Sequence, residues 1–157
     1  MGIITPVNDK AIPNDRSTAL LTDKYELTML QAALRDGSAN RQVTCEVFSR
    51  RLPNERRYGV VAGTERVLRA VEDFRFSANQ LAEMDFLDEQ TKEYLRHYRF
   101  SGQIDGYREG ELYFPNSPIL TVRGTFGECL ILETVILSII CLLYTSLSGL
   151  ARQTADH

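Results

Sequence analysis

Histidine and cysteine are scarce in this chain of 157 residues, which has two histidines and three cysteines. Cys45, Cys129 and Cys141 form no CxxC pair and are odd in number, which favours a reducing compartment over a disulfide-bonded secreted fold. Zinc sites usually need four closely spaced ligands, and no such cluster is present. His97 lies in an acidic, aromatic segment and His157 ends the chain. We therefore predict no metal site and no histidine-activated nucleophile.

The phosphate-binding motifs GxxxxGK[ST] and GxGxxG are absent, and a net charge of −3 provides no overall basic field for nucleic acid. The longest apolar run, residues 129–144, is shorter than a bilayer span and contains Glu133, so we expect a buried helix there. No leader peptide is recognisable at the N-terminus. The sequence thus predicts a cytoplasmic protein without nucleic-acid or membrane partners.

The composition present is that of an ordinary globular protein, with 43% hydrophobic and 25% charged residues, and the length suits one domain. Helical spacing predicts a first helix that Thr22 caps and Gly37 ends, and further helices from Gly63, over 79–84, over 88–98 and from Phe126. Alternating or short apolar runs predict strands over 43–49, 58–62, 102–107, 111–114 and 119–122. Because helices and strands come in separate runs, we expect an α+β fold with helices on a mostly antiparallel sheet.

One stretch is basic in an otherwise acidic chain. Residues 41–69 contain seven arginines and three glutamates, a net charge of +4. Four of these arginines flank Pro53, namely Arg50, Arg51, Arg56 and Arg57. Arginine suits forked recognition of phosphate, so this loop is a candidate anion site. The alternative is a solvated loop whose arginines pair with the acidic helices at 83–93.

Three further features are candidates for a role. Tyr25, in the first turn of the first helix, could stack on a flat ligand or pack in a core or interface. The turn from Gly124 to Gly127 precedes a helix, so its N–H groups could bind an anion or simply form a tight turn. Glu128 and Glu133 need partners if they are buried; a pair with Arg123 is conceivable, but the sequence does not determine it. These alternatives stay open at this point.

Five motifs in order resemble the nicotinate phosphoribosyltransferase family. They are TDKYELTM at 22–29, EVFSRRLP at 46–53, YGVVAG at 58–63, the segments IDGY, EGE and FPNSP between 104 and 118, and GTFGEC at 124–129. The resemblance covers residues 17–140. Ser49 departs from it, standing where an aromatic residue is usual.

The resemblance implies an activity. Members of this family join nicotinate to the ribose of phosphoribosyl pyrophosphate, giving nicotinate mononucleotide and pyrophosphate in the entry step of NAD salvage. ATP hydrolysis is coupled through a phosphorylated histidine, with Mg²⁺ on the phosphates. An N-terminal α+β sandwich is set against a larger α/β barrel, and homodimers build each site from both subunits. By this resemblance Tyr25 stacks on the pyridine ring, and Arg50 and Arg51 lie near phosphates.

The same resemblance implies that the barrel, with the catalytic histidine and the main sugar-phosphate pocket, is missing here. Neither histidine of this chain is assigned that role. We expect a disordered lead-in over 1–16, the family's N-terminal domain over 17–140, and over 141–157 a tail outside the family, from a truncated or frame-shifted reading frame. Such a fragment is expected to be inactive alone and to bind no cofactor, although the full-length enzyme uses Mg²⁺ and ATP.

Other functions stay open beside this one. A fragment of a nicotinamide phosphoribosyltransferase would share the early tyrosine. A non-catalytic dimerisation or ligand-binding module would need no barrel. Binding of single-stranded RNA through the arginine loop is a third possibility, and its mark would be a salt-dependent affinity.

Overall fold

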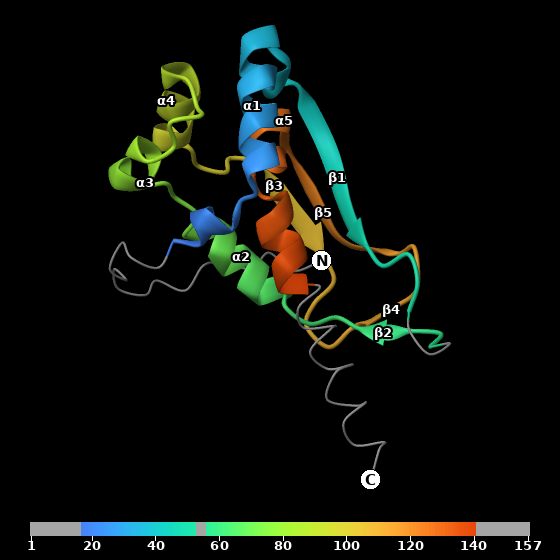
Figure 1. The fold of residues 1–157 in the computed structure, drawn as a ribbon. Helices are drawn as coiled ribbons and strands as arrows, with labels where there is room; N and C mark the ends of the chain where they lie inside the picture. Colours follow the sequence, from blue (N-terminus) through green and yellow to red (C-terminus); the bar gives the residue numbers. More distant parts are fainter. Residues whose placement is uncertain (1–16, 53–55, 141–157) are drawn as a thin grey trace.

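The computed structural model describes residues 17–52 and 56–140, so the expected lead-in and tail lie outside the described residues. The elements are, in chain order, η2 (Thr18–Leu21), α1 (Lys24–Asp36), η3 (Ser38–Asn40), β1 (Gln42–Phe48), β2 (Gly59–Val60), α2 (Thr64–Glu72), α3 (Ala78–Ala82), α4 (Glu89–His97), β3 (Gln103–Gly106), β4 (Leu112–Tyr113), β5 (Pro118–Thr125) and α5 (Phe126–Leu130). Residues 133–140 are helical as well. Figure 1 shows their arrangement.

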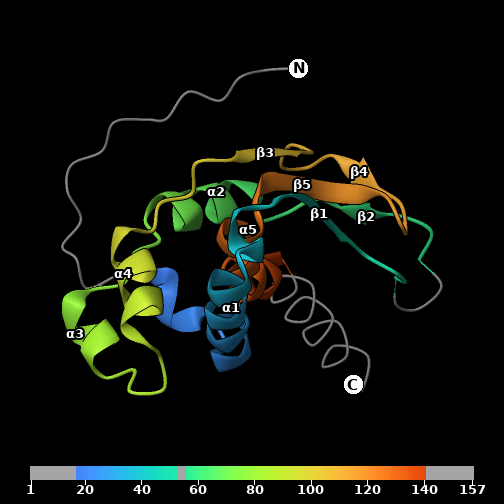
Figure 2. The ribbon, with the colours of Figure 1, turned by 90° about the horizontal axis from the view of Figure 1, so that it is seen from above.

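A three-stranded antiparallel sheet carries the fold, with the strand order β1-β5-β3. In its register Val43 lies opposite Gly124, and Ile104 lies opposite Val122. β2 and β4 form a separate antiparallel pair. Figure 2 shows the helices gathered on one side of the three-stranded sheet. This mixture of helices and antiparallel sheet confirms the predicted α+β class, and the described residues form no closed barrel.

The first helix begins one residue later than the sequence predicted. Asp23 is its N-cap, and the Glu26 carboxylate accepts the Asp23 backbone N–H at 3.0 Å. Thr22 does not cap the helix, because its hydroxyl donates to the distant carbonyl of Ile131 at 3.1 Å. Gly37 ends the helix as predicted, with a left-handed φ of 79° that glycine adopts without strain.

The apolar helix expected from Phe126 onward is broken in two. α5 ends at Leu130, residues 131–132 form a turn, and a second helix covers 133–140. Thr125 caps α5, since its hydroxyl accepts the N–H of Glu128 at 3.4 Å. The N–H of Thr134 is donated to Glu26 of α1 at 2.8 Å and so marks a new helix start. The long-range hydrogen bond between Thr134 and Glu26 ends one helix and starts the next, and local periodicity cannot predict such a bond.

One continuous apolar core joins the helices to the sheet. Its fully buried side chains include Leu30, Phe74, Leu95, Ile131, Leu132 and Val135. The ring of Phe74 packs edge-on against Phe76 and Tyr98, with centroid distances of 5.5 and 5.3 Å. Within residues 17–52 and 56–140, no helix is long and apolar enough to cross a membrane.

Candidate functional site

Tyr25 lies in the first turn of α1 with 45% of its surface exposed. This exposure excludes the core alternative and leaves the stacking and interface alternatives. Partial burial raises the pKa of its hydroxyl, and the nearby Glu133 and Glu26 carboxylates add to this effect. Beside it, the Lys24 ammonium lies 4.7 Å from the centre of the Phe86 ring, a cation–π contact. Tyr25 is therefore an accessible ring on a well-anchored helix start.

A buried carboxylate follows Tyr25 directly in the chain. Glu26 is fully buried, and one of its oxygens accepts the N–H and the hydroxyl of Thr134 at 2.8 and 2.7 Å. Its other oxygen accepts the Asp23 N–H at 3.0 Å. Burial raises the pKa of Glu26, and the hydrogen bonds from Thr134 and Asp23 offset part of that rise. The helix start that presents Tyr25 is thus tied to the start of helix 133–140.

Arg50 and Arg51 follow β1 and are both exposed. The loop that carries them is fixed at Ser49, whose carbonyl accepts the Asn116 N–H at 2.8 Å and whose hydroxyl donates to the Arg51 carbonyl at 2.8 Å. In the part of the chain that the structure describes, neither arginine forms an ion pair. Both guanidinium groups are therefore available to an anion.

The alternative pairing of these arginines with the acidic helices is not formed among the described residues. Asp88 binds Arg35 at 2.8 Å instead, and Glu89 and Glu93 bind Arg96 of their own helix. Figure 1 shows why, since α3 and α4 lie at the opposite end of the molecule from β2 and β4.

Tyr25 and the two arginines do not meet in one pocket. The start of α1 and the loop after β1 occupy separate parts of the molecule in both Figure 1 and Figure 2. Among the described contacts, none joins Tyr25 to Arg50 or Arg51. The described residues thus bring together none of the three predicted ligand-binding side chains.

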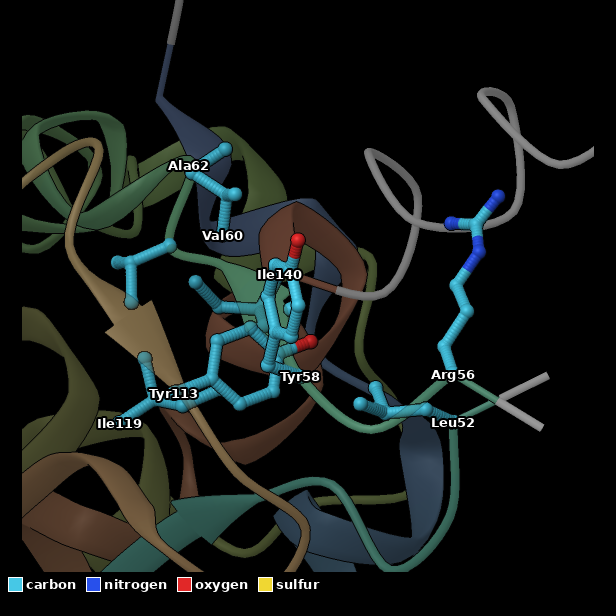
Figure 3. A pocket seen from close by; sticks show the side chains of 10 residues that line it. Leu52, Arg56, Tyr58, Val60, Ala62, Tyr113, Ile119 and Ile140 are labelled. Atoms are coloured by element: carbon cyan, nitrogen blue, oxygen red, sulfur yellow. The ribbon is translucent and has the colours of Figure 1, made fainter.

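A cavity of about 280 Å³ lies elsewhere, between the β2–β4 pair and the end of helix 133–140. Its wall is mostly apolar and includes Leu52, Tyr58, Tyr113, Ile119 and Ile140. Figure 3 shows Arg56 at its rim, with the guanidinium group directed away from the other labelled side chains. Tyr25, Arg50 and Arg51 do not line this cavity, whereas Arg56, from the same candidate anion loop as the two arginines, does.

The conceivable pair of Glu128 with Arg123 is not formed among the described residues. Arg123 binds Asp105 instead, and the Glu128 carboxylate accepts hydrogen bonds from both the N–H and the hydroxyl of Thr125 and of Ser101, at 2.7 to 2.9 Å. Burial alone would raise the pKa of Glu128, but these bonds outweigh it and hold the pKa below its usual value. A neutral cage of donors stabilises this carboxylate in place of a cation.

The turn from Gly124 to Gly127 uses its backbone donors internally. The N–H of Thr125 binds Glu128, and the N–H of Phe126 donates to the Arg41 carbonyl at 2.8 Å. The carboxylate of Glu128 thus occupies the place that an external anion would need. Of the two alternatives, the tight turn is the one that the geometry favours.

Sequence reasoning missed the contact between Glu26 and Thr134. A local signal existed, because Asp23 and Glu26 have the spacing of a capping box, but nothing local indicates that Thr134 completes it. His97 ends α4 exposed and contacts Glu93 at 3.1 Å. Among residues 17–52 and 56–140, no group of three or more His, Cys, Asp or Glu side chains could hold a metal ion.

Comparisons with known proteins identify the domain. A family profile described as the nicotinate phosphoribosyltransferase (NAPRTase) N-terminal domain matches residues 20–141. The nicotinate phosphoribosyltransferase pncB1 of Mycobacterium tuberculosis is 65% identical over 127 residues, which is 80% of this chain and 28% of that protein. The Bacillus subtilis nicotinate phosphoribosyltransferase is 38% identical over 134 residues, which is 80% of this chain and 26% of that protein.

A solved structure agrees with the sequence relatives. The crystal structure of human nicotinic acid phosphoribosyltransferase superimposes with a TM-score of 0.71 and 28% identity, over 76% of this chain and 25% of that one. The fold thus defines an α+β domain of the kind found in phosphoribosyltransferases of pyridine carboxylates. The chain belongs to the nicotinate phosphoribosyltransferase family and matches its N-terminal domain. It spans about a quarter of the length of the curated relatives reported above.

Proposed function

We propose that this chain is the N-terminal part of an enzyme that converts nicotinate and 5-phosphoribosyl 1-diphosphate to nicotinate mononucleotide and diphosphate, with ATP hydrolysis, in cytoplasmic NAD salvage. The observation that carries the proposal is the match of residues 20–141 to the family's N-terminal domain. An exposed Tyr25 at the start of α1 supports it, because a ring that is to stack on a ligand must be open to it.

The two groups of site residues suit the two halves of this reaction. Displacing diphosphate from an anomeric carbon builds positive charge on the sugar and negative charge on the leaving group. Arg50 and Arg51, exposed and without carboxylate partners among the described residues, suit the leaving group's charge. Tyr25 suits the nucleophile, because a stacked ring holds the pyridine in line for attack, an orientation effect.

The separation of Tyr25 from the arginines supports a site that a second subunit completes. We propose that the longer enzyme is a homodimer and that Tyr25 of one subunit serves the pocket of the other. Mg²⁺ and ATP belong, in this proposal, to the longer enzyme. No side chain among the described residues is assigned to either, since these residues hold no metal-ligating cluster.

A direct assay tests the proposal. This chain alone, given nicotinate, phosphoribosyl pyrophosphate, ATP and Mg²⁺, is expected to form little or no nicotinate mononucleotide. The same chain joined to the remaining length of its 65% identical relative is expected to be active. Robust product formation by the short chain would contradict its being a fragment, and an inactive chimaera that folds would contradict the activity itself.

A non-catalytic module remains the second candidate, favoured by the absence of one closed pocket among the described residues around Tyr25 and Arg50. A stable dimer of this chain that shows no response to nicotinate or nicotinate mononucleotide would support the module. A saturable response to either ligand would support the enzyme fragment. Competition between nicotinate and nicotinamide in the active chimaera separates the nicotinate enzyme from its nicotinamide counterpart.

A further inference from the structure

Two buried glutamates organise helix starts in this fold, and only one of them adjoins the proposed ligand-binding ring. Glu26 and Glu128 are both the third residue of a helix whose start they cap, and their exposed fractions are 0% and 8%. Among the described residues, the side chain of Glu128 accepts its hydrogen bonds from Thr125 and Ser101, and none of these donors belongs to the start of α1. Glu26 is the residue next to Tyr25. Glu26 and Glu128 therefore form a matched pair of buried carboxylates, of which only Glu26 lies next to Tyr25.

The segment that holds Tyr25 is attached on both sides to one distant segment. On its N-terminal side, the Thr22 hydroxyl donates to the Ile131 carbonyl at 3.1 Å. On its C-terminal side, Glu26 accepts two hydrogen bonds from Thr134, 108 positions away in the sequence. Tyr25 thus lies between two attachments to residues 131–134, and the backbone beneath its ring has little freedom.

The side chain of Tyr25 faces the same segment. The Glu133 carboxylate lies close enough to the Tyr25 hydroxyl to help raise its pKa, and Glu133 is the residue directly before Thr134. A shift of Thr134 relative to α1 would therefore move both the backbone attachment and the hydroxyl's neighbour. The bond between Glu26 and Thr134 is the common element of this arrangement.

We propose that Glu26 is a positioning residue for Tyr25. Its buried carboxylate, by holding the N–H and hydroxyl of Thr134, sets the direction in which the exposed ring meets a flat pyridine ligand. This role rests on the proposed function, in which Tyr25 stacks on nicotinate. Glu26 itself touches no ligand, because it is fully buried.

The test compares Glu26→Gln with Glu128→Gln, a matched loss of one buried carboxylate. In Glu26→Gln, the amide NH₂ group meets the Asp23 N–H or the Thr134 donors, so at least one hydrogen bond is lost. Thr134→Ala removes the hydroxyl partner alone, and Thr134→Ser restores it. The readout is the resonance of Tyr25 in ¹³C-tyrosine-labelled chimaeras with the 65% identical relative, which complete the proposed site. The resonance is assigned by its loss in Tyr25→Phe and is followed through a titration by nicotinate.

We expect Glu26→Gln and Thr134→Ala to move the Tyr25 resonance and to weaken nicotinate binding about threefold to tenfold, the effect of one lost hydrogen bond. Glu128→Gln and Thr134→Ser should leave the Tyr25 resonance in place, whatever their effect on the unfolding midpoint. A Tyr25 resonance unchanged in folded Thr134→Ala and Glu26→Gln overturns the proposal. If Glu26→Gln does not fold, the two Thr134 variants carry the same comparison.

The failure of the proposed function would look different. In that case the wild-type Tyr25 resonance does not respond to nicotinate, although it still moves in Glu26→Gln and Thr134→Ala. That result would reject nicotinate as the ligand while supporting the positioning role of Glu26. A response to nicotinate that is identical in all variants would overturn the positioning role alone.

Discussion

Tyr25 is the residue on which the proposed recognition of nicotinate depends. Removing its ring in Tyr25→Ala should weaken nicotinate binding about fivefold, since aromatic stacking contributes about 1 kcal/mol beyond burial. Tyr25→Phe keeps the ring and should bind nearly as the wild type does. A nicotinate titration of both variants in the active chimaera, followed by NMR, measures this. Equal binding by the alanine and wild-type chains would contradict a stacking role.

Glu128 makes the stability of the fold depend on pH. Its pKa is lowered in the folded chain, whereas an unfolded glutamate titrates near about 4.3. The group therefore contributes stability above the unfolded pKa, and this contribution is lost as the pH falls through the folded pKa. Glu128→Gln should flatten the acid-side loss of unfolding free energy below about pH 5.

Urea unfolding of the wild-type and Glu128→Gln chains at a series of pH values measures the difference in the pH dependence of their stability. Glu26 provides a contrast, because its pKa is raised in the folded chain. Its contribution to stability falls as the pH rises from the unfolded to the folded pKa. Parallel curves for wild type and Glu128→Gln would show that the four hydrogen bonds do not lower the pKa of Glu128.

Single residues could be named from the sequence more easily than their partners. Glu128 was recognised as a group that needs a partner if it is buried, but the sequence did not determine that partner, and Arg123 pairs with Asp105 instead. A carboxylate can be satisfied by neutral donors such as Ser101 and Thr125, and no sequence pattern marks these. Tyr25 was singled out by its place at a helix start, and Arg50 and Arg51 by the local charge. The family resemblance then implied their roles, which stay predictions.

At the scale of elements, the loop after β1 is the candidate for binding the leaving group. Because Arg50 and Arg51 are exposed and their interactions are screened by water, each should contribute about threefold to the affinity for diphosphate. Calorimetric titration of Arg50→Ala/Arg51→Ala should show this loss, and it should shrink as salt rises. The control Arg66→Ala/Arg69→Ala removes the same charge from α2. Equal weakening in both would indicate a general charge effect.

The end of α1 depends on the backbone of Gly37. Its φ of 79° strains any residue with a Cβ, although no atom lies within 4 Å of where a Cβ would stand. Gly37→Ala should therefore lower the unfolding free energy by about 1 kcal/mol. Gly102→Ala should cost more, since its Cβ would overlap the Arg123 carbonyl. Thermal unfolding followed by circular dichroism ranks the two, and a more stable Gly37→Ala would contradict the strain.

Periodicity located most elements but not the points where distant contacts alter them. α1, α4 and the strands lie near their predicted positions, because apolar spacing and caps are local properties. The start of α1 and the break after Leu130 were missed, since Thr22 and Thr134 bind across the fold. Long-range hydrogen bonds decided both cases.

At the scale of the whole molecule, a single core predicts one cooperative unfolding transition. Leu132→Ala creates a cavity in this core and should lower the unfolding free energy by about 2 to 5 kcal/mol. Leu137→Ala, in the helix 133–140 that follows and 39% exposed, should cost much less. Urea unfolding followed by near- and far-ultraviolet circular dichroism measures both. Transitions that do not coincide would show that the helices and the sheet unfold separately.

The α+β class was predictable because the helix signals and the strand signals come in separate runs along the chain. The pairing order β1-β5-β3 was not, since β5 follows β3 in the chain but lies between it and β1. Nor could the sequence show that Tyr25 lies apart from Arg50 and Arg51. Local patterns define elements, whereas packing alone decides which of their surfaces meet.

The attachment of residues 22–26 to residues 131–134 also sets an order of events during protein synthesis. A ribosome makes α1 early, yet Glu26 finds Thr134 only after 108 further residues have been added. Until then its carboxylate stays in water, and the ring beside it has no settled direction. The first segment of this domain to be translated is thus among the last to reach its final form.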